Sequence, residues 1–84
     1  MNSRQRKTLA AIFFRPTKSD IEWAAIESLF KALGASIAEG RGSRVRISLR
    51  GAAATFHRPH PKPQADQGLV DNVRKFLQDV GVEP

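Results

Sequence analysis

Residues 40–61 read GRGSRVRISLRGAAATFHRPHP, and this stretch decides how the chain is expected to fold. From Ser43 to Arg50, apolar and polar side chains alternate, which predicts an antiparallel strand with one face in the core and the other in solvent. Ala52 to His57 predicts the returning strand, because Gly51 supplies a turn between the two. The side chains expected on the buried face of the first strand are Val45, Ile47 and Leu49.

A two-residue hairpin loop at Arg50-Gly51 fixes the register of these two strands. On one face, the pairs are then all apolar: Leu49 with Ala52, Ile47 with Ala54, and Val45 with Phe56. On the other face, Ser48 meets Ala53, Arg46 meets Thr55, and Arg44 meets His57. The Cβ atoms of Arg44 and His57 are expected roughly 5 Å apart. A loop of another length would break this register.

Two helices and a short strand are expected before this hairpin. Residues 4–14 predict a helix with Ser3 as its N-cap, and Arg15-Pro16 ends it. Ser19 and Glu22 have the spacing of a capping box at the start of a second helix, which Gly34 terminates. Trp23 begins the apolar stripe of this helix, so we expect it in the core rather than stacked on a base. Residues 35–39 predict the short strand.

Beyond the hairpin, the prolines at 59, 61 and 63 favour an extended segment. Asp66 is expected to cap a last helix that runs through Gln78 and ends at Gly81, with Val82 folding back on it. The order helix, helix, strand, strand, strand, helix predicts an α+β domain in which helices pack on a three-stranded antiparallel sheet. This is the plan of double-stranded-RNA-binding-like domains with an added N-terminal helix. With 84 residues in all, we expect one domain, residues 1–84.

The charge of the chain points to an anionic partner. Fourteen basic and eight acidic residues give a net charge of +6 and a pI of about 10.9. Residues 41–62 contain no Asp or Glu, and this clustering favours a polyanion or an acidic protein over a generally solvated basic surface. There is no cysteine, no secretory signal and no apolar run long enough to span a membrane. The sequence therefore predicts a soluble, cytoplasmic protein.

The hairpin register places His57 on the arginine-bearing face, which indicates a site for RNA. A neutral imidazole can take the proton of a ribose 2′-hydroxyl, and an arginine beside it favours the neutral form. Arg44 would stabilise charge on the phosphate that the oxygen attacks. The alternative is a surface histidine that only contacts phosphate. His60 would contribute to the same site or would hold its turn by hydrogen bonding.

Other side chains of the segment are expected to bind RNA without taking part in the chemistry. The sequence shows no carboxylate cluster that would hold a metal, and no cofactor is expected. Ser43 lacks an adjacent base, so a serine nucleophile is not expected. The predicted RNA-binding residues are Arg41, Ser43, Arg46, Arg50, Arg58 and Lys62.

The chain resembles the HicA family of bacterial toxins over roughly residues 19–83. The resemblance rests on Gly42-Ser43 before a strand, on His60-Pro61, and on a C-terminal helix ending in glycine; GSRVR and FHRPHP resemble a longer branch of the family. It implies a double-stranded-RNA-binding-like fold, cleavage of messenger RNA, and neutralisation by a HicB antitoxin that covers the basic face.

One position departs from the family. Many members carry a catalytic histidine just after the Gly-Ser pair, where this chain has Arg44. Our hypothesis is that His57 supplies the missing imidazole from the neighbouring strand. The alternatives are a non-catalytic RNA-binding module of the same fold and a small DNA-binding or structural protein. The last is disfavoured because no tight turn joins the first two helices.

Overall fold

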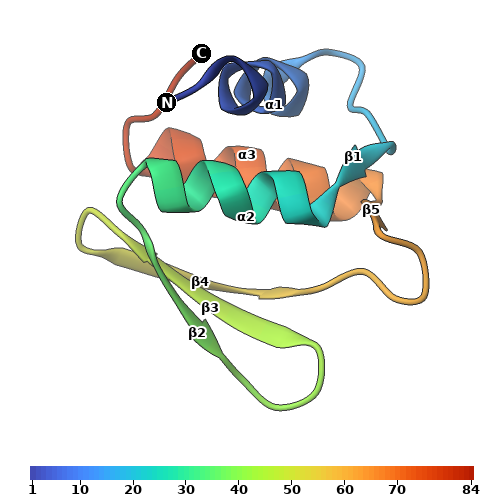
Figure 1. Ribbon diagram of the computed structural model, residues 1–84, viewed down its shortest axis with the longest axis vertical. Coiled ribbons are helices and arrows are strands. Elements are labelled where there is room, and N and C mark those ends of the chain that lie inside the picture. The colour runs from blue at the N-terminus through green and yellow to red at the C-terminus, as the bar shows by residue number, and fades with distance from the viewer.

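Three helices and two small sheets lie in three layers in the computed structural model, which describes residues 1–84 (Figure 1). Helix α1 forms one outer layer, α2 and α3 lie side by side in the middle, and the larger sheet forms the other outer layer (Figure 1). The helices are α1 (Ser3–Phe13), α2 (Trp23–Ala32) and α3 (Gln67–Asp79). The strands are β1 (Ile21–Glu22), β2 (Ser36–Glu39), β3 (Arg44–Leu49), β4 (Ala52–His57) and β5 (Gln64–Ala65). The α+β class and the order of the three helices and the three strands of the larger sheet are confirmed.

The register of the β3–β4 hairpin is the one that the sequence predicts. The larger sheet has the order β2-β3-β4, and all six expected pairs of β3 and β4 occur, from Leu49 with Ala52 to Arg44 with His57. Val45, Ile47 and Leu49 are buried, whereas Arg44 and Arg46 are exposed. Binary patterning and a short turn were therefore sufficient to set the two faces of this sheet.

The turn of the hairpin has a left-handed backbone at both central residues. Arg50 has φ 51° and Gly51 has φ 82°, the combination that a two-residue turn of the I′ type requires. Glycine adopts such angles freely, but arginine does so rarely. The Arg50 guanidinium donates a hydrogen bond from Nη1 to the carbonyl oxygen of Val80, 2.9 Å away, which ties the turn to the C-terminal end of α3.

Helix α1 begins one residue earlier than expected, because Asn2 and not Ser3 is its N-cap. The Asn2 side chain accepts a hydrogen bond from the backbone nitrogen of Gln5 at 2.8 Å, and the Gln5 side chain accepts one from the backbone nitrogen of Asn2 at 2.9 Å. This reciprocal pair is a capping box. An asparagine is as good an N-cap as a serine, so sequence alone did not separate the two candidates.

The capping box predicted at Ser19 and Glu22 is wrong. Ile21–Glu22 is the strand β1, which pairs with β5, and α2 begins only at Trp23 without a side-chain cap. The backbone nitrogen of Trp23 donates instead to the carbonyl oxygen of Pro63, at 2.9 Å. A tertiary ladder thus satisfies backbone groups that a local cap would otherwise satisfy, and it buries Ile21. Neither β1 nor β5 was expected from the sequence.

The core between the helices and the sheet centres on aromatic rings. Phe56 of β4 packs against Trp23 and Phe30 of α2 and against Phe76 of α3, with ring centroids 6.0–6.2 Å apart. Trp23 is 5% exposed, so it is a core residue as predicted and its ring is not available for base stacking. Because Phe56 points inward, the next residue, His57, must point to the outer face of the sheet.

The caps of the last helix are also confirmed. The Asp66 carboxylate accepts a hydrogen bond from the backbone nitrogen of Leu69 at 2.8 Å, which caps α3 at its start. Gly81 has φ 79°, and Val82 is buried against the core. None of the three helices combines the length and the apolar character that crossing a membrane requires.

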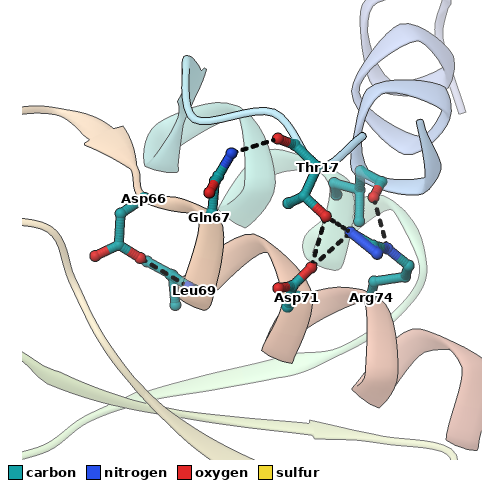
Figure 2. A network of polar contacts seen from close by, with 7 residues as sticks. Thr17, Asp66, Gln67, Leu69, Asp71 and Arg74 are labelled. Atoms are coloured by element: carbon teal, nitrogen blue, oxygen red, sulfur yellow. Dashed lines mark hydrogen bonds and ion pairs between the residues drawn. The ribbon is translucent and has the colours of Figure 1, made fainter. Parts of the chain in front are cut away.

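A buried arginine joins α1 to α3 on the side of the helices away from the sheet (Figure 2). Arg74 donates from Nε to the carbonyl oxygen of Ile12 at 3.0 Å, and from Nη2 to Thr17 Oγ1 at 2.7 Å and Asp71 Oδ1 at 2.9 Å. Thr17 Oγ1 donates in turn to Asp71 Oδ1. The guanidinium therefore binds the C-terminal end of α1 and the loop that follows it.

Candidate nucleic-acid interface

The outer face of the β2-β3-β4 sheet carries Arg44 and His57 as directly opposed residues. The backbone nitrogen of Arg58 donates to the carbonyl oxygen of Ser43 at 2.9 Å, so Ser43 and Arg58 form a hydrogen-bonded pair. Because such pairs alternate along an antiparallel ladder, the next pair, Arg44 and His57, has no backbone hydrogen bonds between its two residues. Side chains of a pair without backbone hydrogen bonds lie closest together, with Cα atoms about 4.5 Å apart. Both side chains are exposed. The arrangement therefore places an imidazole and a guanidinium side by side in contact with solvent.

Two further arginines lie on the same face as Arg44. Arg41, Arg44 and Arg46 line one cavity of about 330 Å³, together with Thr55 of β4 and residues of β2. We call Arg41, Arg44 and Arg46 the arginine trio. None of the three takes part in an ion pair within the protein. Three guanidinium groups without internal carboxylate partners have free donors for phosphate oxygens.

His60 and Lys62 lie apart from the arginine trio. Both line a separate cavity of about 220 Å³ between the end of β4 and β5. His57 lines a third cavity, of about 420 Å³, which also includes Asp66 and Leu69 at the start of α3. No side-chain hydrogen bond joins the two histidines or holds the turn around His60. The structure thus brings His57 beside Arg44 in the strand pair, whereas His60 lines a cavity that neither of them lines.

Arg58 binds two carboxylates of the protein itself. Its Nε donates to Glu27 Oε2 at 2.7 Å, and its Nη2 donates to Glu39 Oε2 at 2.8 Å. Hydrogen bonding to Glu39 and then to Glu27 raises the pKa of Arg58, and hydrogen bonding to Arg58 lowers the pKa of Glu39. The Arg58 side chain is 28% exposed, and that of Glu27 is 18%. Arg58, the residue after β4, therefore joins the end of this strand to α2 and β2, and phosphate would have to compete with both carboxylates for it.

Glu27 and Glu39 were not among the residues expected at the site. Glu27 also accepts a hydrogen bond from Trp23 Nε1, so one carboxylate fixes both the core tryptophan and Arg58. The signal that was available is that Glu39 lies two residues before the start of the acid-free residues 41–62. Two predicted RNA-binding residues remain, Ser43 and Arg50. Ser43 is exposed beside Arg44, whereas the Arg50 side chain is hydrogen-bonded to the C-terminal end of α3.

No group of three or more His, Cys, Asp or Glu side chains lies close enough together to hold a metal ion. The site is thus a basic sheet face of a small α+β domain, with one imidazole among its guanidinium groups. Such a face is suited to a polyanion.

The family model described as HicA toxin of bacterial toxin-antitoxin matches residues 23–82. The chain therefore belongs to the HicA toxin family, and a toxin of a toxin–antitoxin system has an antitoxin as its partner. The match begins at the first residue of α2, so α1 and β1 lie outside it. A comparison with curated proteins gave no match, and neither did one with solved structures.

Proposed function

We propose that this HicA toxin is an endoribonuclease that cuts messenger RNA in the cytoplasm by acid–base chemistry, and that a HicB-like antitoxin neutralises it. The observation that supports the proposal is the Arg44–His57 pair on the exposed basic face. The family position that usually carries a histidine is occupied here by Arg44, and His57 lies directly across from it. The pair therefore offers an imidazole beside the position where the family has one.

The proposed reaction needs only groups of the protein and the RNA. His57 takes the proton of a ribose 2′-hydroxyl, and the 2′-oxygen attacks the adjacent phosphorus. Arg44 stabilises the charge that develops on the phosphate oxygens. The bond from phosphorus to the 5′-oxygen breaks, the leaving oxygen takes up a proton, and a 2′,3′-cyclic phosphate remains. His60, which lines a separate cavity from His57, is the other imidazole of the chain that could deliver that proton.

Removal of a single 2′-hydroxyl is the test of this function. Cleavage sites are first mapped on transcripts with the purified protein, and a synthetic RNA is then made that contains one mapped site. We expect a 2′-deoxy substitution at the nucleotide before the scissile bond to abolish cleavage, and the uncut RNA to remain bound. Cleavage of the deoxy substrate at the same position would contradict the proposed attack by the 2′-oxygen.

The alternative is a non-catalytic RNA-binding module, which the free guanidinium groups of the arginine trio favour. Both functions require that the trio binds phosphate. We expect an alanine substitution of Arg41, Arg44 or Arg46 to weaken binding of a single-stranded RNA. The slope of log affinity against log salt concentration should become shallower by about 0.7 for each phosphate that the variant no longer binds. Fluorescence anisotropy at several salt concentrations measures both quantities.

Arg50→Ala is the matched control for these substitutions. It removes the same charge, but the Arg50 guanidinium is bound to Val80 at the other end of the hairpin. Its effect on the salt dependence should therefore be smaller than that of Arg44→Ala. Equal slopes for the two variants would show that net charge, and not the face of the sheet, determines binding.

A further inference from the structure

The outer edge of β4 has unpaired backbone groups. β4 is the last strand of the sheet and pairs only with β3. The hydrogen bond from the backbone nitrogen of Arg58 to the carbonyl oxygen of Ser43 shows which residues of β4 are hydrogen-bonded to β3, since every second residue is. The N–H and C=O groups of Ala52, Ala54 and Phe56 therefore point toward β3, and those of Ala53, Thr55 and His57 point outward. No hydrogen bond within the protein uses these outward groups.

There is open space along this edge. A cavity of about 420 Å³ lies beside His57, and one of about 300 Å³ lies beside Ala53. Thr55 and Phe56 of β4 and Asn72 of α3 line both cavities, so the two are neighbours along one groove. We call the space between the β4 edge and α3 the β4–α3 groove. Its helix side includes the apolar side chains of Leu69 and Phe76, and also the charged side chains of Asp66, Lys75 and Asp79.

The β4 edge lacks the features by which free edges usually avoid pairing. Proteins protect such edges with charged side chains, prolines, bulges or very short strands. β4 reads AAATFH, pairs with β3 without a bulge, and has no proline before Pro59. The opposite edge, β2, has only four residues and ends at Glu39, whose carboxylate is bound to Arg58. The unprotected β4 edge is suited to pairing with a strand from outside.

We propose that the β4–α3 groove binds an extended segment of the antitoxin as an added strand with acidic residues on one face and apolar residues on the other. Main-chain hydrogen bonds to Ala53, Thr55 and His57 would hold it, as in other strand additions. Its apolar side chains would face Leu69 and Phe76. Its acidic side chains would face the arginine side of the sheet.

Charge and side-chain size determine this choice of occupant. Neighbouring strands are about 4.8 Å apart, so the added strand would lie about 10 Å from β3. Ala53 and Thr55, which would lie between them, are small, so glutamate and arginine side chains can meet above them. Residues 41–62, which form the sheet side, contain no carboxylate that would repel the acidic groups. The two carboxylates of the groove, Asp66 and Asp79, lie on its helix side, toward which the apolar side chains of the added strand would point. A second copy of this chain would instead bring two arginine faces together, each on a molecule of charge +6.

An added strand would also cover His57, whose backbone lies on this edge and whose side chain lies on the arginine face. Neutralisation of the toxin would then follow from strand addition. This regulatory consequence rests on the proposed nuclease function, whereas the binding itself does not.

Amide hydrogen exchange followed by NMR tests the proposal, with a synthetic peptide as the probe. The peptide has seven residues that alternate glutamate and valine, with both ends blocked. In the free protein, we expect the amides of Ala53, Thr55 and His57 to exchange fast and those of Ala54 and Phe56 to exchange slowly. At a peptide concentration about ten times the dissociation constant, the three outward amides should slow about tenfold.

Two controls separate strand addition from simple charge attraction. A peptide with proline in place of the central valine, and one with lysine in place of glutamate, should both fail to protect the three amides. In the protein, Thr55→Pro should abolish protection by removing one outward donor, since edge strands tolerate proline there. Thr55→Val keeps the donor and should bind the peptide like the parent protein.

Several results would overturn the proposal: no protection at millimolar peptide, equal protection by the proline peptide, or binding that perturbs only Arg44 and Arg46. RNA cleavage is measured separately on the same protein. Protection without cleavage would leave the docking site intact and remove the nuclease function. Cleavage without protection would remove the docking site and leave the nuclease function intact.

Discussion

His57→Ala is expected to reduce RNA cleavage by about 10²- to 10⁴-fold, the usual contribution of a general base. RNA affinity should remain close to that of the parent protein, because the phosphate-binding charges lie on the arginine trio and not on the imidazole. The fold should also be preserved, since His57 is exposed. Cleavage and anisotropy assays on the same preparation measure both effects.

His60→Ala is the natural comparison for this variant. It removes the other imidazole of the chain from a cavity that His57 does not line. We expect a smaller loss of cleavage for His60→Ala, and we expect added imidazole to restore part of the activity of His57→Ala. If His57→Ala cut RNA as fast as the parent protein, His57 would not be the base. If it lost affinity and cleavage in equal measure, His57 would act by binding the RNA and not as the base.

Arg74→Ala is expected to lower the free energy of unfolding by about 3 kcal/mol or more, which is a large part of the stability of a small domain. The Arg74 residue is 4% exposed, and its guanidinium makes three hydrogen bonds. Its removal leaves the carbonyl oxygen of Ile12 without this donor and leaves Asp71 without its cation. For a domain of this size, 3 kcal/mol corresponds to a fall in Tm of about 12–24 °C. Thermal unfolding followed by circular dichroism measures the shift.

Lys75→Ala is the matched control, because Lys75 is the next residue of α3 and is exposed. It should change Tm by little. Limited trypsin digestion adds a local readout, since α1 contains Arg4, Arg6 and Lys7 and Arg74 holds its C-terminal end. Cleavage in α1 should be faster in Arg74→Ala than in Lys75→Ala. Equal Tm values for the two variants would show that the buried guanidinium adds nothing to stability.

The hairpin could be predicted because its information is local. Alternation over 43–50 and 52–57 assigns each side chain to a face, and a two-residue turn leaves one register that keeps both faces consistent. The Arg44–His57 pair follows from that register without any knowledge of the rest of the fold. The caps at Asp66 and Gly81 are local in the same sense, since each acts within one helical turn.

The capping box at Ser19 failed for the opposite reason. Its spacing was correct, but the backbone of β1 is satisfied by β5, more than forty residues away in the chain. Local propensity competes with tertiary pairing, and here the pairing also buries Ile21. A two-residue strand has no periodicity of its own, so no pattern in the sequence could have indicated it.

By itself, the sequence determined the faces of the sheet, the core position of Trp23 and the neighbourhood of Arg44 and His57. Only the tertiary structure decided which arginines are free to bind a partner. Arg58 meets Glu27 and Glu39 across 31 and 19 residues of chain, and Arg74 meets Ile12 across 62. Arginines in one acid-free segment look equivalent in the sequence, because the carboxylates and carbonyls that bind some of them come from other elements. The packing of α2 and α3 on the sheet brings those partners within hydrogen-bonding distance, and it leaves the arginine trio without them.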